Sequence, residues 1–232
     1  MSNIYTSADQ LIGKTPLLEL THIEKAHDLK AKIVAKLEYF NPAGSVKDRL
    51  GEYFIKDAEE RGELKKGSTI IEATAGNTGL GIAFAALNKG YRVIFVVPTK
   101  FSVEKQTLMR ALGAELINTP RELGMKGATD KANELLAAIP GSVSFRQFEN
   151  PANPMAHYLM TGPEIYEDMD GKIDYFVAGA GTGGLPCAHS TVPLPTWIGE
   201  TMTCSGASSS ISRQTAVTSA TASMEPTSWK WI

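Results

Sequence analysis

Lys47 is the residue whose type and setting most clearly suggest chemistry. It lies in residues 41–49, NPAGSVKDR, where Pro42 and Gly44 fit a loop and Ser45 fits the N-cap of a following helix. The positive end of a helix disfavours an ammonium group, and burial does so further. Both effects lower a lysine pKa toward the range where the amine can form a Schiff base or accept a proton. An exposed lysine on a helix is the plain alternative.

A second segment, TAGNTG at residues 74–79, follows an apolar stretch and leads into a predicted helix. Its small residues allow backbone N–H groups to approach a ligand closely, and the helix N-terminus adds a positive field. This combination is typical of a carboxylate or phosphate cradle. An ordinary strand-to-helix turn remains the alternative.

A third segment, GAGTGG at residues 179–184, also follows a predicted strand. Its glycines satisfy the dinucleotide pattern G-x-G-x-x-G. The acidic residue at a plausible distance is Glu200, which has no predicted helix or second strand before it. A dinucleotide site is therefore disfavoured.

The elements that must position these segments alternate between strand and helix. This alternation predicts parallel βαβ units in an open sheet covered on both faces, with the ligand crevice beyond the carboxyl ends of the strands. Both glycine-rich loops are expected at that edge. The predicted strands are 15–20, 32–38, 69–73, 92–97, 114–118, 142–145 and 174–178, and the predicted helices are 46–61, 77–88, 102–112, 125–138 and 155–168, the last interrupted near Gly162 and Pro163.

Composition excludes several classes of function. The 232 residues are 43% hydrophobic and 21% charged, which is typical of a globular chain of one or two domains. A net charge of −2 gives no reason to expect nucleic acid or an anionic membrane as partner. The N-terminus lacks signal-peptide features and no apolar run approaches about 18 residues, so we expect a cytoplasmic protein. Both cysteines lie late, at 187 and 204, and the histidines have no ligand spacing, so no metal site is predicted.

Together, the three segments resemble the cysteine synthase and cystathionine β-synthase family of fold-type II pyridoxal-phosphate enzymes. The resemblance runs almost continuously from Ile4 to Gly184 and includes RQFENPANP and TGPEI downstream. The EATAGNTG form, with the helix KFSVEKQTLMRALGAEL, looks more like the branch that makes cystathionine from O-acetylserine and homocysteine.

The resemblance implies roles for individual residues. Lys47 would hold pyridoxal 5′-phosphate as the Schiff-base lysine and later remove the α-proton of the substrate. Asn77 would contact the cofactor's ring oxygen, and Gln147 matches a glutamine on the substrate side. The implied phosphate cup is Gly181, Thr182, Gly183 and Gly184, and the implied substrate-carboxylate site is Thr74, Gly76, Asn77 and Thr78.

The implied function is β-replacement on O-acetylserine, or serine, through an aminoacrylate, with sulfide or homocysteine as nucleophile. The implied fold is α/β, with two open doubly wound βαβ sheet domains of which the larger is incomplete. Residues 1–45 with 151–184 would belong to the larger, cofactor-binding domain and residues 46–150 to the smaller one. The implied partners are amino-acid substrates, a second copy in a homodimer and serine acetyltransferase.

Some positions depart from the family pattern. Ala73 and Ala75 stand where members commonly carry proline and serine, and the missing hydroxyl at 75 would weaken a carboxylate contact or widen the pocket. Leu185 stands where the family has a threonine on the phosphate. CSGA at 204–207 mimics the late serine motif at the pyridine nitrogen, but it lies too early in the chain.

The composition changes abruptly after Gly184. Residues 185–232 contain all three tryptophans and both cysteines, only four charged residues and no Asp, Asn, Phe or Tyr. A Ser/Thr-rich disordered extension is one reading. Our hypothesis is an aberrant tail from a reading-frame or gene-damage event, although one frameshift does not account for all of it. An inactive truncated fragment and a non-catalytic binding module are therefore the alternatives to an active enzyme.

Overall fold

A computed structural model describes residues 4–179 and 181–186 of the chain. The proposed aberrant tail lies outside the described residues, apart from Leu185 and Pro186. In chain order the elements are η1 (Ala8–Leu11), β1 (Leu17–Glu19), α1 (Thr21–Ala26), β2 (Val34–Lys36), η2 (Glu38–Phe40), α2 (Lys47–Glu60), β3 (Thr69–Ala73), α3 (Asn77–Ala85), β4 (Arg92–Pro98), α4 (Val103–Ala111), β5 (Glu115–Thr119), η3 (Arg121–Leu123), α5 (Gly124–Ala138), α6 (Ala152–Ala156), the π-helical turn η4 (His157–Thr161) and α7 (Gly162–Asp168).

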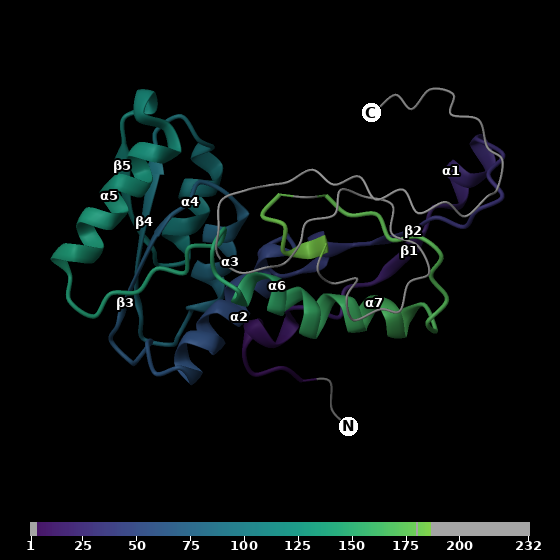
Figure 1. Cartoon of the computed structure of the whole chain (residues 1–232), viewed down its shortest axis with the longest axis horizontal. Helices are drawn as coiled ribbons and strands as arrows, with labels where there is room; N and C mark the ends of the chain where they lie inside the picture. Colours follow the sequence, from purple (N-terminus) through teal and green to yellow (C-terminus); the bar gives the residue numbers. More distant parts are fainter. Residues whose placement is uncertain (1–3, 180, 187–232) are drawn as a thin grey trace.

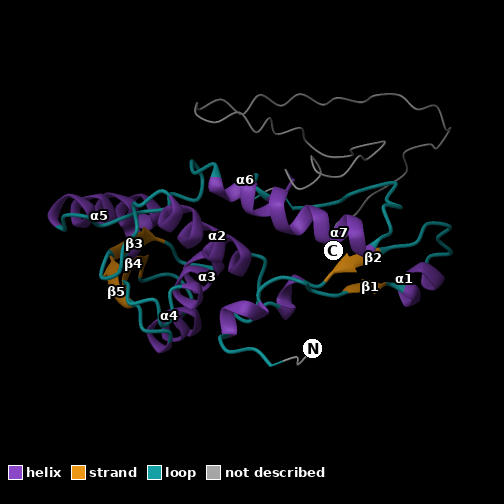
Figure 2. Cartoon of the chain, turned by 90° about the horizontal axis from the view of Figure 1, so that it is seen from below, coloured by secondary structure: helices purple, strands orange, loops and turns teal. Residues whose placement is uncertain are grey.

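The main sheet is parallel, with strand order β3-β4-β5. Because side chains alternate across a strand, Val93, Phe95 and Val97 of β4 pack in one buried cluster with α2, α3 and α4, whereas Ile94 and Val96 pack in another with α5. Figures 1 and 2 show this layering, with α5 on one face of the sheet and α3 and α4 on the other. The βαβ prediction is therefore confirmed for this part of the chain.

The parallel register decides where the loops leave the sheet. Ala73 at the end of β3 pairs with Val96 of β4, so the loops that follow the two strands emerge at the same edge. These loops are residues 74–76 and 99–102. The predicted cradle and the start of α4 are therefore neighbours.

A second, two-stranded sheet pairs β1 with β2 in antiparallel register. It lies at the opposite end of the molecule from the main sheet, beside α7, with α2 and α6 between the two (Figure 1). No helix within the described ranges is both long and apolar enough to cross a membrane.

Most predicted elements occur within a residue or two of their expected bounds, but four differ. The helix expected to reach Asn88 ends at Ala85, because Asn88 and Gly90 adopt positive φ angles of 61° and 80° and turn the chain away. The strand expected at 142–145 is reduced to a single bridge between Ile70 and Val143. Strand pairing does not continue beyond Val143, because the backbone N–H groups of Phe145 and Arg146 donate to the buried carboxylate of Glu72 and not to β3.

The prediction of a strand at residues 174–178 is wrong, because this segment is irregular in the structure. A strand needs a continuous ladder with a neighbour, and the described residues form none there. The helix expected at 155–168 is interrupted by the π-helical turn His157–Thr161, which comes before Gly162. Pro163 lies in the first turn of α7, directly after the π-helical turn.

Candidate active site

Helices α2 and α3 cross with their backbones in contact, and this crossing brings two of the three segments together. A Cβ atom at Gly51 would collide with the backbone of Gly81, and one at Gly81 would collide with the carbonyl oxygen of Lys47. Only glycine permits this approach. The first turn of α2, which carries Lys47, therefore lies against the first turns of α3, which continue from the 74–76 loop.

Lys47 is the first residue of α2 and is half-buried. The hydroxyl of Ser45 accepts its backbone N–H at 3.2 Å, but the N-cap residue is Val46 and not Ser45 as predicted, because the helical backbone begins one residue later. Burial lowers the pKa of the Lys47 amine. No described residue makes a hydrogen bond or ion pair with this amine, which leaves it available to a ligand.

Asp48 ties the preceding loop to the helix. Its Oδ2 accepts the backbone N–H of Ala43 at 2.6 Å, whereas its Oδ1 is buried without a partner among the described residues. Burial raises the pKa of this carboxyl to about 6, against the opposing effect of hydrogen bonds from Ala43 and Ser45. The loop that precedes Lys47 is therefore held by the Asp48 carboxyl group, which changes its protonation state near pH 6.

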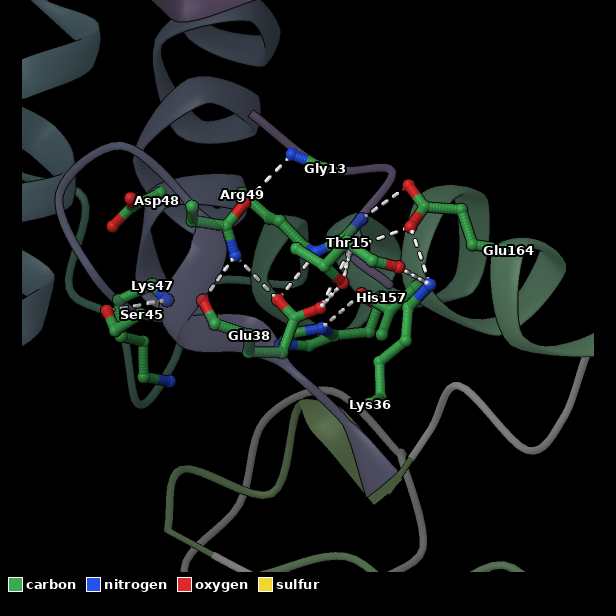
Figure 3. A network of polar contacts seen from close by, with 12 residues as sticks. Gly13, Thr15, Lys36, Glu38, Ser45, Lys47, Asp48, Arg49, His157 and Glu164 are labelled. Carbon is green, nitrogen blue, oxygen red and sulfur yellow. Dashed lines mark hydrogen bonds and ion pairs between the residues drawn. The ribbon is translucent and has the colours of Figure 1, made fainter. Parts of the chain in front are cut away.

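Arg49 anchors the same turn on the side of the second sheet. Its fully buried guanidinium makes two hydrogen bonds to each of two carboxylates, at 2.8 and 2.9 Å to Glu38 and at 2.6 and 2.7 Å to Glu164 (Figure 3). Lys36 joins the network at 3.3 Å from Glu164, and the Thr15 hydroxyl donates to Glu38 at 2.6 Å. Burial by itself would raise the pKa of both glutamates, but bonding to Arg49 outweighs it and holds them below their usual values.

The 74–78 loop lines the other side of this junction. Thr74 and Thr78 are buried, and the Thr78 hydroxyl donates to the side-chain oxygen of Gln147 at 2.6 Å. A Cβ at Gly76 would meet nothing within 4 Å, so there is open space beside the loop. Asn77 is exposed and accepts a 2.8 Å hydrogen bond from Nζ of Lys105, a residue of α4.

The third segment meets this junction through α6 and the π-helical turn. The amide nitrogen of Asn153 donates to the backbone oxygen of Gln147 at 2.7 Å and to the Thr182 hydroxyl at 2.8 Å. A Cβ at Gly184 would collide with Oδ1 of Asn153 and lie 3.2 Å from a ring carbon of His157. Ala180, the second residue of the segment, lies outside the described residues.

His157 is fully buried beside Gly184 of the third segment. Its Nδ1 is 3.0 Å from the Thr161 hydroxyl, whereas its Nε2 has no partner among the described residues. Burial, together with the positive charges of Lys47 and Arg49, lowers the pKa of His157 to about 4. The ring is therefore neutral at physiological pH, and one ring nitrogen is unused.

The structure thus brings the predicted residues into one connected region. The Lys47 turn contacts α3, hydrogen bonds run from Thr78 through Gln147 and Asn153 to Thr182, and Gly184 packs against Asn153 and His157. The residues that the sequence analysis missed are Asn153, His157 and Lys105. The first two had a readable signal, since Asn153, His157 and Thr161 recur at every fourth residue and so lie on one face of a helix.

No group of three or more His, Cys, Asp or Glu side chains suited to a metal occurs in the described ranges.

Comparison with known proteins identifies the family of this region. The family model described as "Pyridoxal-phosphate dependent enzyme" matches residues 8–221. The chain belongs to this family. It is 50% identical over 181 residues to the O-acetylserine dependent cystathionine beta-synthase of Bacillus subtilis, and 49% identical over 181 residues to a cysteine synthase of Helicobacter pylori strain J99.

A solved structure agrees with these relatives. The chain superposes on the crystal structure of an O-acetylserine dependent cystathionine beta-synthase from Helicobacter pylori with a TM-score of 0.77 and 44% identity, over 84% of this chain and 66% of that one. The expected fold, that of a fold-type II pyridoxal-phosphate enzyme, is thereby confirmed. The two sequence relatives match 78% of this chain, which spans only 58% and 59% of their own lengths.

Pyridoxal phosphate is the cofactor of the family, and the residues present fit it. The amine of Lys47 has a lowered pKa and no partner within the described part of the chain, open space lies beside Gly76, and a Cβ at Gly181 would meet nothing within 4 Å. Two buried polar atoms nearby, Oδ1 of Asn153 and Nε2 of His157, lack partners among the described residues. These are the features that a bound polar cofactor would use.

Proposed function

We propose that this chain uses pyridoxal 5′-phosphate to catalyse β-replacement on O-acetylserine or serine, with sulfide or homocysteine as nucleophile. The observation that carries the proposal is the crossing of α2 and α3 at Gly51 and Gly81, which sets the Lys47 turn against the helix that follows the 74–76 loop. Relatives at about 50% identity carry the names of two such enzymes.

The proposed roles divide by the chemistry of each group. Lys47 would hold the cofactor covalently, and its free amine would remove the α-proton, for which its lowered pKa is suited. Asn77 would contact the cofactor ring. Gly181, Thr182, Gly183 and Gly184 would hold its phosphate. When bound, the cofactor supplies an electron sink for the charge that the lost proton leaves behind.

The substrate carboxylate is assigned to Thr74, Gly76, Asn77 and Thr78. The first backbone N–H groups of α3 have no partner within the helix, and the helix N-terminus favours an anion in the open space beside Gly76. Gln147 orients the Thr78 hydroxyl by accepting its hydrogen at 2.6 Å. Lys47, on the helix that crosses α3, is the base to which the α-proton would be presented.

Three further assignments complete the proposal. Residues 1–45 with 151–184 form the larger, cofactor-binding domain and residues 46–150 form the smaller one. The active form is a cytoplasmic homodimer, and its active site also receives a segment of serine acetyltransferase. The domain division, the homodimer and the partner rest on the family resemblance.

A chain without turnover is the second candidate. The observation that favours it is the irregular course of residues 174–178, where the sequence predicts a strand, with Tyr175 62% and Val177 86% exposed. Residues 174–178 directly precede the phosphate cup. Because they are not incorporated into a sheet, no neighbouring strand holds the cup in position.

The test is a turnover assay on the purified 232-residue chain loaded with pyridoxal phosphate. O-acetylserine is supplied with either sulfide or homocysteine, and cysteine and cystathionine are measured by mass spectrometry. The proposal expects one of these products from the wild-type chain and a loss of about 10³-fold or more in Lys47→Ala, since that variant lacks both the attachment point and the base. Lys56→Ala serves as the lysine control, because Lys56 is an exposed lysine of the same helix whose ion pair is with Glu60 at 4.0 Å. Equal product from Lys47→Ala and the wild type would overturn the assignment.

A further inference from the structure

Asn153 is a buried polar residue to which neither the family match nor the proposed roles assign any function. It lies in α6 and is 1% exposed. A buried amide of this kind must have its hydrogens bonded, and both of its amide hydrogens are used. One goes to the backbone oxygen of Gln147 at 2.7 Å and the other to Oγ1 of Thr182 at 2.8 Å.

These two bonds fix the direction of the Thr182 hydroxyl. Because the amide nitrogen only donates, Oγ1 of Thr182 must accept in this contact. The same oxygen also receives the backbone N–H of Gly184, at a longer 3.5 Å. With its acceptor sites occupied, Thr182 has its own hydrogen left to donate.

We infer that Asn153 is a positioning residue that turns the Thr182 hydroxyl into a donor for the phosphate group of the cofactor. The inference rests on the proposed function, which places that phosphate in the 181–184 cup. Asn153 also couples the cup to the substrate side, because the Gln147 whose backbone it holds accepts the Thr78 hydroxyl at 2.6 Å. One amide thus sets the distance between the phosphate cup and the carboxylate loop.

The packing around Gly184 supports this role. A Cβ at Gly184 would lie 2.7 Å from Cγ of Asn153 and would collide with its Oδ1. The cup is therefore pressed against the Asn153 amide with no room for another side chain. A substitution that moves the Asn153 side chain would therefore also move the backbone of the cup at Gly184.

Asn153→Asp tests the inference, because aspartate has the same size but no hydrogens to donate. Its matched control is Asn150→Asp, because Asn150 lies in the adjoining loop and bonds to the backbone of Phe145 and Ala152 instead of Thr182. Affinity is measured by absorbance titration with pyridoxal phosphate and with pyridoxal, which lacks the phosphate. We expect Asn153→Asp to bind pyridoxal phosphate about 10- to 100-fold more weakly, with pyridoxal little affected and Asn150→Asp near the wild type.

Thr182 variants keep the test decisive if Asn153→Asp fails to fold. Thr182→Ser retains the hydroxyl and should bind like the wild type, whereas Thr182→Val should show the phosphate-specific loss. Equal losses for pyridoxal phosphate and pyridoxal in Asn153→Asp, or unchanged binding in both Asn153→Asp and Thr182→Val, would overturn the inference.

A measurement with inorganic phosphate separates this inference from the proposed function. Phosphate should raise the melting temperature of the cofactor-free wild type and of Asn150→Asp, but not that of Asn153→Asp or Thr182→Val. If the phosphate effect depends on Asn153 while pyridoxal phosphate fails to label Lys47, the proposed function fails, whereas the part of the inference in which Asn153 directs the Thr182 hydroxyl toward a phosphate stands. If Lys47 is labelled and phosphate stabilises all four chains equally, the inference alone fails.

Discussion

The Thr78 hydroxyl donates a 2.6 Å hydrogen bond to the side-chain oxygen of Gln147, a residue 69 positions later in the chain. This bond joins the start of α3 to the segment that continues into α6 and the π-helical turn. It therefore links the proposed carboxylate loop to the proposed phosphate cup. The site depends on this connection, because the two loops belong to different parts of the fold.

The Thr78–Gln147 bond should be measurable as a coupling energy. We expect Thr78→Val and Gln147→Leu each to lower the free energy of unfolding, and the double variant to lose about 1 kcal/mol less than the sum of the two. Urea denaturation of the four chains measures this. Strictly additive losses would mean that the two side chains do not interact in solution.

The crossing of α2 and α3 predicts a sharp difference between glycines. Gly81→Ala should destabilise the chain by about 3 kcal/mol or more, because its new methyl group would collide with the backbone of Lys47 and neither helix can yield without losing core contacts. Gly76→Ala is the control, since a Cβ there meets nothing within 4 Å. Thermal unfolding followed by circular dichroism compares them. Similar melting temperatures for the two variants would contradict the close crossing.

Arg49 should be among the residues most costly to replace. Arg49→Met would leave Glu38 and Glu164 facing each other across a buried space, and we expect a loss of about 3–5 kcal/mol of stability. The control is Arg92→Met, which removes an ion pair with Glu115 at 2.7 Å whose two side chains are about half exposed. Denaturation midpoints should separate the two variants clearly. Equal effects would show that the buried network contributes no more than a surface pair.

The ionisation of Asp48 and that of His157 should change the free energy of unfolding in opposite directions as pH rises. Burial raises the pKa of Asp48 to about 6, so between about pH 4 and 6 the folded chain holds a proton that the unfolded chain lacks, and stability falls as pH rises. Burial lowers the pKa of His157 to about 4, so between about pH 4 and 6.5 the unfolded chain binds the extra proton, and stability rises with pH.

The two slopes offset each other in the wild type, and removing one should expose the other. In Asp48→Asn, stability should rise from about pH 4 to 6.5 more steeply than in the wild type. In His157→Gln, it should fall from about pH 4 to 6. Urea titrations at closely spaced pH values check both slopes. The account of these two groups is wrong if both variants keep the wild-type profile.

The sequence was sufficient to predict the βαβ part of the fold because each of its elements carries a local signal. Residues 69–73 are predicted as a strand and form β3 with the same bounds, and Gly113 ends α4 with a φ of 87° as a helix-stop glycine should. Motif and family likeness also indicated Lys47, Thr78 and Gln147, and the structure joins the last two by a hydrogen bond.

What the sequence did not reveal depends on long-range contacts. The strand predicted at 174–178 has strong local propensity, but strand formation requires a neighbour that the described chain does not provide. No buried role was predicted for Arg49, because its burial depends on Glu164, 115 residues away. Asn153 and His157 share a helix face, yet that face is identified as a site only by the loop that packs on it.

The most direct test of the central claim is to locate the covalent attachment of the cofactor. The purified chain is incubated with pyridoxal phosphate, reduced with borohydride and digested, and the modified peptide is identified by mass spectrometry. We expect stoichiometric labelling at Lys47, suppressed by prior incubation with O-acetylserine and absent from Lys47→Ala. Labelling spread over exposed lysines, unchanged in Lys47→Ala, would contradict the claim.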